Sequence, residues 1–107
     1  MWSGVDLNTQ ERRSGATALQ EAVKRGDSQI VAMLARAGAK PNIADSKGRT
    51  ALHEAADGCH YQIARILILV GADVTSHSGL GETPLRLAEH ADCAQVSEML
   101  RRAGGEE

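Results

Sequence analysis

Aromatic side chains are almost absent from this chain. Its 107 residues include one Trp, one Tyr and no Phe, so aromatic residues make up only 2%. A core must therefore be built from Leu, Ile, Val, Ala and Met, which suits closely packed helices. The same scarcity argues against a single-stranded nucleic-acid surface, because such surfaces stack bases on aromatic rings.

Long apolar runs and a cysteine framework are missing too. No run approaches the ~20 apolar residues that span a bilayer, and the N-terminal MWSGVDLNTQERR lacks an apolar signal core. We therefore expect no membrane association and an intracellular location, either cytoplasmic or nuclear. The two cysteines, Cys59 and Cys93, are expected to be free surface thiols, as is usual in an intracellular chain.

Charge is distributed unevenly along the chain. Charged residues make up 24% and hydrophobic residues 42%, which is typical of a soluble globular protein. Residues 1–49 hold eight Lys/Arg and five Asp/Glu (+3), whereas residues 50–107 hold four and nine (−5), which together give the net charge of −2. This polarity can orient a protein partner, but it is too weak to favour nucleic acid.

An internal repeat organises almost the whole sequence. GATALQEAV begins at Gly15, GRTALHEAA at Gly48 and GETPLRLAE at Gly81, a step of 33 residues each time. Seven columns are identical in all three copies: Gly15/Gly48/Gly81, Thr17/Thr50/Thr83, Leu19/Leu52/Leu85, Ala22/Ala55/Ala88, Gln29/Gln62/Gln95, Leu34/Leu67/Leu100 and Gly38/Gly71/Gly104. Agreement in so many columns predicts three copies of one structural unit.

Each unit is predicted to contain two short helices. The repeated Thr suits a helix N-cap, and the Leu and Ala columns follow at helical spacing. A second helix is expected to start near Asp27, His60 and Cys93 and to end at the column of Gly38. Its buried face is predicted to be Ile30, Val31 and Leu34, then Ile63, Ile66 and Leu67, then Val96, Met99 and Leu100. Such short helices are unstable alone, so the units should stack.

The repeat resembles the ankyrin repeat family. The resemblance rests on the 33-residue period, on TALH and TPL in the second and third copies, and on GAD at residues 71–73. It implies an all-α solenoid of three helix–turn–helix repeats joined by β-turn or hairpin loops. Gln20 and Arg86 replace the usual His of the motif, and Cys59 and Asp92 stand where glycine is usual.

The period divides the chain into four parts. Residues 1–14 form an N-terminal segment, 15–47 the first repeat, 48–80 the second, and 81–107 a C-terminal capping repeat and tail. GVDLN at residues 4–8 resembles the tail of a preceding repeat. Two interpretations stay open: the chain is part of a longer array, or Trp2, Val5 and Leu7 form a native cap. A monomer is expected unless the chain belongs to something longer.

Candidate catalytic and metal-binding residues are few. His53 has no matched nucleophile, and the resemblance implies that it bonds the Thr and backbone at the helix start. Cys59, His60, His90 and Cys93 form the only metal-like cluster. Since helices in stacked repeats lie ~8–10 Å apart, zinc ligation is not favoured. No serine lies in a nucleophile elbow. We therefore expect no enzymatic activity, no metal and no cofactor.

A protein partner is the remaining expectation. The resemblance implies recognition through the hairpin tips and the concave first-helix face, where basic residues could meet an acidic surface or peptide. The predicted contact residues are Arg13, Ser14, Lys24, Arg25, Ser46, Lys47, Arg49, Asp57, Gly79, Leu80, Glu82 and His90. Two alternatives remain: an inhibitory subunit that occludes an enzyme such as a kinase, or a structural spacer within a larger protein.

Overall fold

The computed structural model describes residues 7–105, which contain six helices. They are α1 (Ala18–Arg25), α2 (Ser28–Arg36), α3 (Ala51–Asp57), α4 (Tyr61–Leu69), α5 (Pro84–His90) and α6 (Ala94–Arg102). No strand occurs within this range, so the expected all-α class is confirmed. Trp2, Val5 and residues 4–6 of the GVDLN segment lie outside the described residues.

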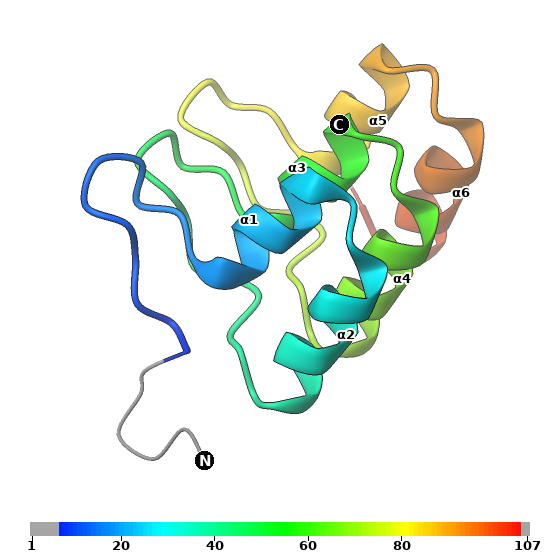
Figure 1. The fold of residues 1–107 in the computed structure, drawn as a ribbon. Coiled ribbons are helices and arrows are strands. Elements are labelled where there is room, and N and C mark those ends of the chain that lie inside the picture. Colours follow the sequence, from blue (N-terminus) through cyan, green and yellow to red (C-terminus); the bar gives the residue numbers. More distant parts are fainter. Residues whose placement is uncertain (1–6, 106–107) are drawn as a thin grey trace.

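The helices form two layers, with α1, α3 and α5 in one and α2, α4 and α6 in the other (Figure 1). Within each repeat the two helices pack antiparallel against each other, and each packs on its equivalent in the next repeat. The loops that precede α1, α3 and α5 project to the same side of the first-helix layer (Figure 1). Within residues 7–105, no helix is long and apolar enough to cross a membrane.

The first helices begin where the repeated Thr predicted. Thr17 and Thr83 accept a hydrogen bond from the backbone N–H groups of Gln20 and Arg86, at 3.3 and 3.2 Å. Pro84 occupies the first turn of α5, where its missing N–H leaves no bond unmade. The second helices begin after Asp27, His60 and Cys93, also as predicted.

The core consists of the repeated Leu and Ala columns and the inner face of the second helices. Leu19, Leu52, Leu67 and Leu100 are almost completely buried. The prediction for Ile30 is wrong, because its side chain is 42% exposed although the equivalent Ile63 and Val96 are each only 2% exposed. The reason is its position: α2 and α4 cover the following second helices, whereas no described element covers α2 on its N-terminal side.

Candidate functional site

The loops between repeats are stacked by one backbone hydrogen bond at each junction. Ser46 donates its N–H to the carbonyl of Ser14, and Gly79 donates to the carbonyl of Lys47, both at 2.8 Å. Gly48 has a φ of +75°, and a Cβ there would lie 2.6 Å from the N of Gly79. Glycine is therefore required both by the left-handed backbone and by the close approach of the next loop.

One side chain of α1 and one of α3 reinforce this stacking. Gln20 donates to the carbonyl of Arg49 at 2.8 Å, and its own oxygen accepts from the backbone N–H of Thr17. His53, one repeat later, contacts the carbonyl of Glu82 at 2.8 Å through Nε2 and the N–H of Thr50 at 3.1 Å through Nδ1. Both side chains are buried, so these bonds are shielded from water.

His53 is therefore structural and neutral. The Thr50 N–H can only donate, so Nδ1 must accept and the proton must lie on Nε2, where it is donated to Glu82. Burial lowers the pKa of His53, and the nearby charge of Arg49 lowers it further, against the opposing effect of the Glu82 carbonyl. This agrees with the role that the sequence resemblance implied, and it leaves His53 no free nitrogen for catalysis.

A basic groove lies between the first two loops and the first-helix face. It has a volume of about 500 Å³ and is lined by Arg13, Ser14, Lys24, Asp45, Ser46, Lys47, Arg49 and Glu54. Four cationic side chains thus face two carboxylates. We call this the basic groove.

A second groove lies between the second and third loops. It has a volume of about 650 Å³ and is lined by Asp45, Ser46, Lys47, Gly48, Arg49, Ser78, Gly79, Leu80 and Glu82. Its two cations are balanced by two carboxylates, and Leu80 on its wall is 88% exposed. We call this the neutral groove. The two grooves share residues 45–47 and Arg49, so they form one continuous surface.

Carboxylates of the chain itself neutralise part of the basic groove. Arg49 Nη2 lies 2.9 Å from Glu54 and 3.3 Å from Asp57, and Lys24 lies 3.9 Å from Glu54. Arg49 Nη2 and Nε are buried and lack an aligned acceptor among the described residues, so the contact with Glu54 is an ion pair without a directed hydrogen bond. In contrast, Arg13 and Lys47 are exposed and have no ion pair within residues 7–105.

The structure brings nine of the twelve predicted contact residues to these two grooves. The other three do not line them: Arg25 and His90 are exposed at the ends of α1 and α5, and Asp57 is engaged by Arg49. Asp45 and Glu54 also line the grooves and were not among the predicted residues. Asp45 accepts backbone N–H bonds from Lys47 and Arg49 and thereby shapes the loop tip. An Asp at the start of a turn is a usable signal for such a bond, because its side chain can accept from the backbone N–H two residues further on.

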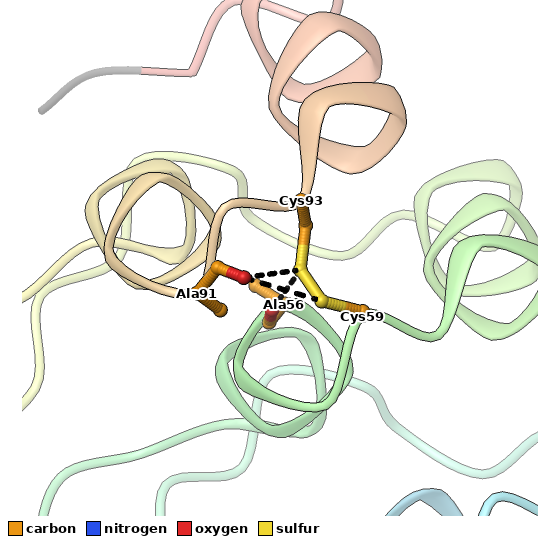
Figure 2. The surroundings of a disulfide bond; sticks show 4 residues. All are labelled: Ala56, Cys59, Ala91 and Cys93. Atoms are coloured by element: carbon orange, nitrogen blue, oxygen red, sulfur yellow. Dashed lines mark hydrogen bonds between the residues drawn. A yellow bond between two sulfur atoms is a disulfide. The ribbon is translucent and has the colours of Figure 1, made fainter.

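The expectation of free thiols is wrong. Cys59 and Cys93 form a disulfide between the second and third repeats, with their Cα atoms 5.6 Å apart (Figure 2). His60 and Cys93 occupy equivalent helix starts in successive repeats and are therefore separated by the helix spacing. Cys59 lies one residue earlier, in the left-handed turn between α3 and α4, and this turn carries its side chain toward the third repeat.

The described part of the chain contains no cluster of side chains suited to bind a metal ion. Within residues 7–105, no group of three or more His, Cys, Asp or Glu side chains is placed to hold a metal ion. Cys59 and Cys93 are bonded to each other. The ring of His60 instead packs beside the turn glycines, with Cε1 3.0 Å from the Cβ position of Gly26.

Comparison with known proteins agrees with the repeat architecture. Residues 1–78 match a family model described as ankyrin repeats, in three copies. A search of curated proteins gave no match. The pair of helices α5 and α6 lies beyond the matched residues, yet it packs on α3 and α4 as the preceding pairs pack on each other.

Proposed function

Because the chain belongs to the ankyrin repeat family, we propose that it binds a protein partner through its loop tips and the concave first-helix face. Ankyrin repeats are generally protein–protein interaction modules and typically have no enzymatic activity. A rigid stack with side chains at regular intervals offers an extended recognition surface. The two grooves beside the loop tips support a partner-binding role for this surface.

The proposed contact residues are those predicted from the sequence, and the nine of them that line the grooves give the two grooves different chemistry. The basic groove suits an acidic segment, because Arg and Lys at its rim attract carboxylates and exclude cations. The neutral groove suits an apolar residue next to that segment, packed against Leu80. The proposed ligand is therefore a protein surface or peptide with carboxylates followed by an apolar side chain.

The observation that carries this proposal is the exposure of Arg13 and Lys47 at the basic groove without carboxylate partners of their own. Arg49 and Lys24 differ, because Glu54 already compensates them. Reversing the charge of Arg49 would place a like charge beside Glu54 and Asp57 and disturb the fold. A sharp test therefore changes Arg13 and Lys47 and leaves the ion pairs with Glu54 intact.

The experiment compares proteins captured from a cell lysate by the unchanged chain and by three variants. Arg13→Glu with Lys47→Glu reverses the free cations of the basic groove, and Leu80→Ser removes the exposed apolar side chain of the neutral groove. Arg36→Glu with Arg65→Glu is the matched control, since these exposed arginines in α2 and α4 line neither groove. Circular dichroism establishes that all four proteins are folded.

A partner that the control retains and the groove variants lose would support the proposal. We expect the double groove variant to weaken that partner by about ten-fold or more at low salt, and less at high salt, where exposed charges are screened. Identical capture by all four proteins would contradict recognition through these grooves. Loss only with the control variant would place the contact on the second helices instead.

A further inference from the structure

Cys59 occupies a position whose backbone favours glycine. Its φ is +57°, in the left-handed region that L side chains rarely adopt. The equivalent residue of the first repeat is Gly26, with a φ of +71°. The equivalent residue of the third repeat, Asp92, has a φ of +60°, which Asp tolerates better than most L residues. A cysteine at this position is locally unfavourable, and what it contributes to the structure is its disulfide.

Cys93 also stands where another residue would serve the local structure better. It is the N-cap residue of α6, yet its side chain makes no capping hydrogen bond. Asp27, its equivalent in the first repeat, caps α2 by accepting from the N–H of Ile30 at 3.1 Å. Carboxylate-bearing Asp is among the best N-cap residues, so cysteine here again gives up local stability.

The two cysteines meet at the junction between repeats 2 and 3. The disulfide joins the turn after α3 to the start of α6, and nothing equivalent joins repeats 1 and 2 in the described residues. We propose that Cys59–Cys93 is a thiol–disulfide exchange site for a small thiol of the glutathione class. Cys59 receives the thiol, and the state of the bond sets the stability of the third repeat. This inference requires no protein partner and is independent of the proposed function.

Exposure and charge favour attack at Cys59. Cys59 is exposed, whereas Cys93 is only 7% exposed. A thiolate RS⁻ attacks Cys59 Sγ, an RS–Sγ bond forms, the Sγ–Sγ bond breaks, and Cys93 leaves as a thiolate. That thiolate lies at the N-terminus of α6, where the helix dipole favours negative charge. A second RS⁻ then attacks the mixed disulfide and releases RSSR, so two RSH are oxidised as the protein disulfide is reduced to two thiols.

The junction is also prepared for the reduced state. Cys59 Sγ lies 3.9 Å from the carbonyl oxygen of Ala91, and Cys93 Sγ lies 3.9 Å from that of Ala56 (Figure 2). In the disulfide neither sulfur has a proton to donate. After reduction, the two sulfurs must move apart to van der Waals separation, and each thiol then has a carbonyl of the opposite repeat nearby as an acceptor for its weak S–H donor. The cross-link is lost, but both thiols stay at the same junction, so the bond can form again.

The test places the chain in buffers of reduced and oxidised glutathione at several ratios, then blocks free thiols and maps the cysteines by mass spectrometry. We expect the disulfide in oxidising buffer, two thiols in reducing buffer, and a glutathione adduct mainly on Cys59 between them. Hydrogen exchange of the wild type is followed in parallel. Protection of α5 and α6 is expected to fall on reduction while that of α1 and α2 stays nearly constant.

Two variants separate exchange chemistry from folding. Cys93→Ala removes the resolving thiol and is expected to retain the adduct on Cys59. Cys59→Gly fits the left-handed backbone, so its melting temperature should equal or exceed that of the reduced wild type. Closing a chain segment with a cysteine separation of 34 residues should make the oxidised wild type melt on the order of 10 °C above its reduced form.

Three results would overturn the inference. The first is a folded wild type that keeps two free thiols in oxidising buffer. The second is an adduct that forms mainly on Cys93. The third is equal protection of α5 and α6 in the oxidised and reduced wild type, because the bond would then not set the stability of the third repeat.

Discussion

Gln20 and His53 hold the two junctions of this solenoid in the same way, but with different chemistry. Each lies three residues after the capping Thr, accepts from that Thr N–H and reaches the carbonyl 29 residues further on, Arg49 or Glu82. An amide side chain does not titrate, whereas an imidazole does. The second junction also contains the Cys59–Cys93 disulfide, which has no counterpart at the first.

The first junction is instead supplemented by ion pairs. Lys24 of the first repeat approaches Glu54 of the second at 3.9 Å, and Glu54 also binds Arg49 at 2.9 Å. The comparison teaches that backbone acceptors fix the geometry of stacking, while the donor side chains decide which conditions affect it. We therefore expect the first junction to respond mainly to salt, and the second to pH and thiols.

Removing the imidazole should have the largest effect. His53→Ala leaves the Thr50 N–H and the Glu82 carbonyl without their buried partner and opens a cavity, so a loss of about 3 kcal/mol in the free energy of unfolding is expected. His53→Gln recreates the chemistry of Gln20 and should lose about 1 kcal/mol or less. Urea denaturation measures both. Equal losses would show that the two junctions are not interchangeable.

Next in size is the effect of a methyl group at the loop tips. Gly48→Ala should cost about 2 kcal/mol, since strain at a φ of +75° is added to the 2.6 Å approach of Gly79. Gly81→Ala is the matched control: it has a φ of +79° with nothing within 4 Å of the Cβ position, so about 1 kcal/mol is expected. Thermal denaturation compares the two variants. A greater loss at Gly81 would contradict stacking of the loops as described.

A smaller effect should follow from pH. The pKa of His53 is lowered by burial, so the unfolded chain binds more protons than the folded chain between the folded and unfolded pKa values. The stability from neutral His53 is therefore complete above the unfolded value near 6.5 and is lost as the pH falls below it. His53→Gln should flatten this dependence in urea titrations between pH 7.5 and 5.5, whereas Gln20→His should steepen it.

The smallest expected effect concerns the ion pair between the first two repeats. Lys24→Gln removes contacts of 3.9 and 4.0 Å made by a half-exposed ammonium, so it should change stability by no more than about 0.5 kcal/mol. Chemical denaturation at low and high salt measures the difference, which should vanish at high salt. A loss above about 1 kcal/mol would show that Lys24 is part of a stronger network at this junction.

Much of the fold follows from the repeated columns alone. Thr at a fixed position before an apolar Leu–Ala pattern predicted the starts of the first helices, and Thr17 and Thr83 indeed cap them. The same periodicity gave a wrong prediction of burial at Ile30, because it predicts the same burial for equivalent residues in every repeat. Burial depends on the neighbour as well as on the residue, so the first member of a stack differs from those that follow.

The candidate surface was predicted in composition but not in charge balance. The sequence identified Arg49 and Lys24 as available cations, whereas the structure pairs both with Glu54. Such pairings depend on side-chain distances across repeats, which a linear pattern does not specify. The disulfide was missed for a related reason. Cys59 lies one residue before the helix start that is equivalent to Cys93, and its left-handed backbone brings the two sulfurs together.

The hydrogen bonds between repeats are accepted by main-chain carbonyls, so they do not depend on the side chains of the accepting residues. Arg49 and Glu82 hold neighbouring repeats together through atoms that every amino acid has, while their side chains line the grooves. Either side chain can be replaced without removing the bond that its carbonyl accepts. Under the proposed function, the side chain of Glu82 can vary with the ligand while the bond to its carbonyl stays, whereas the Arg49 side chain also contributes its ion pair with Glu54.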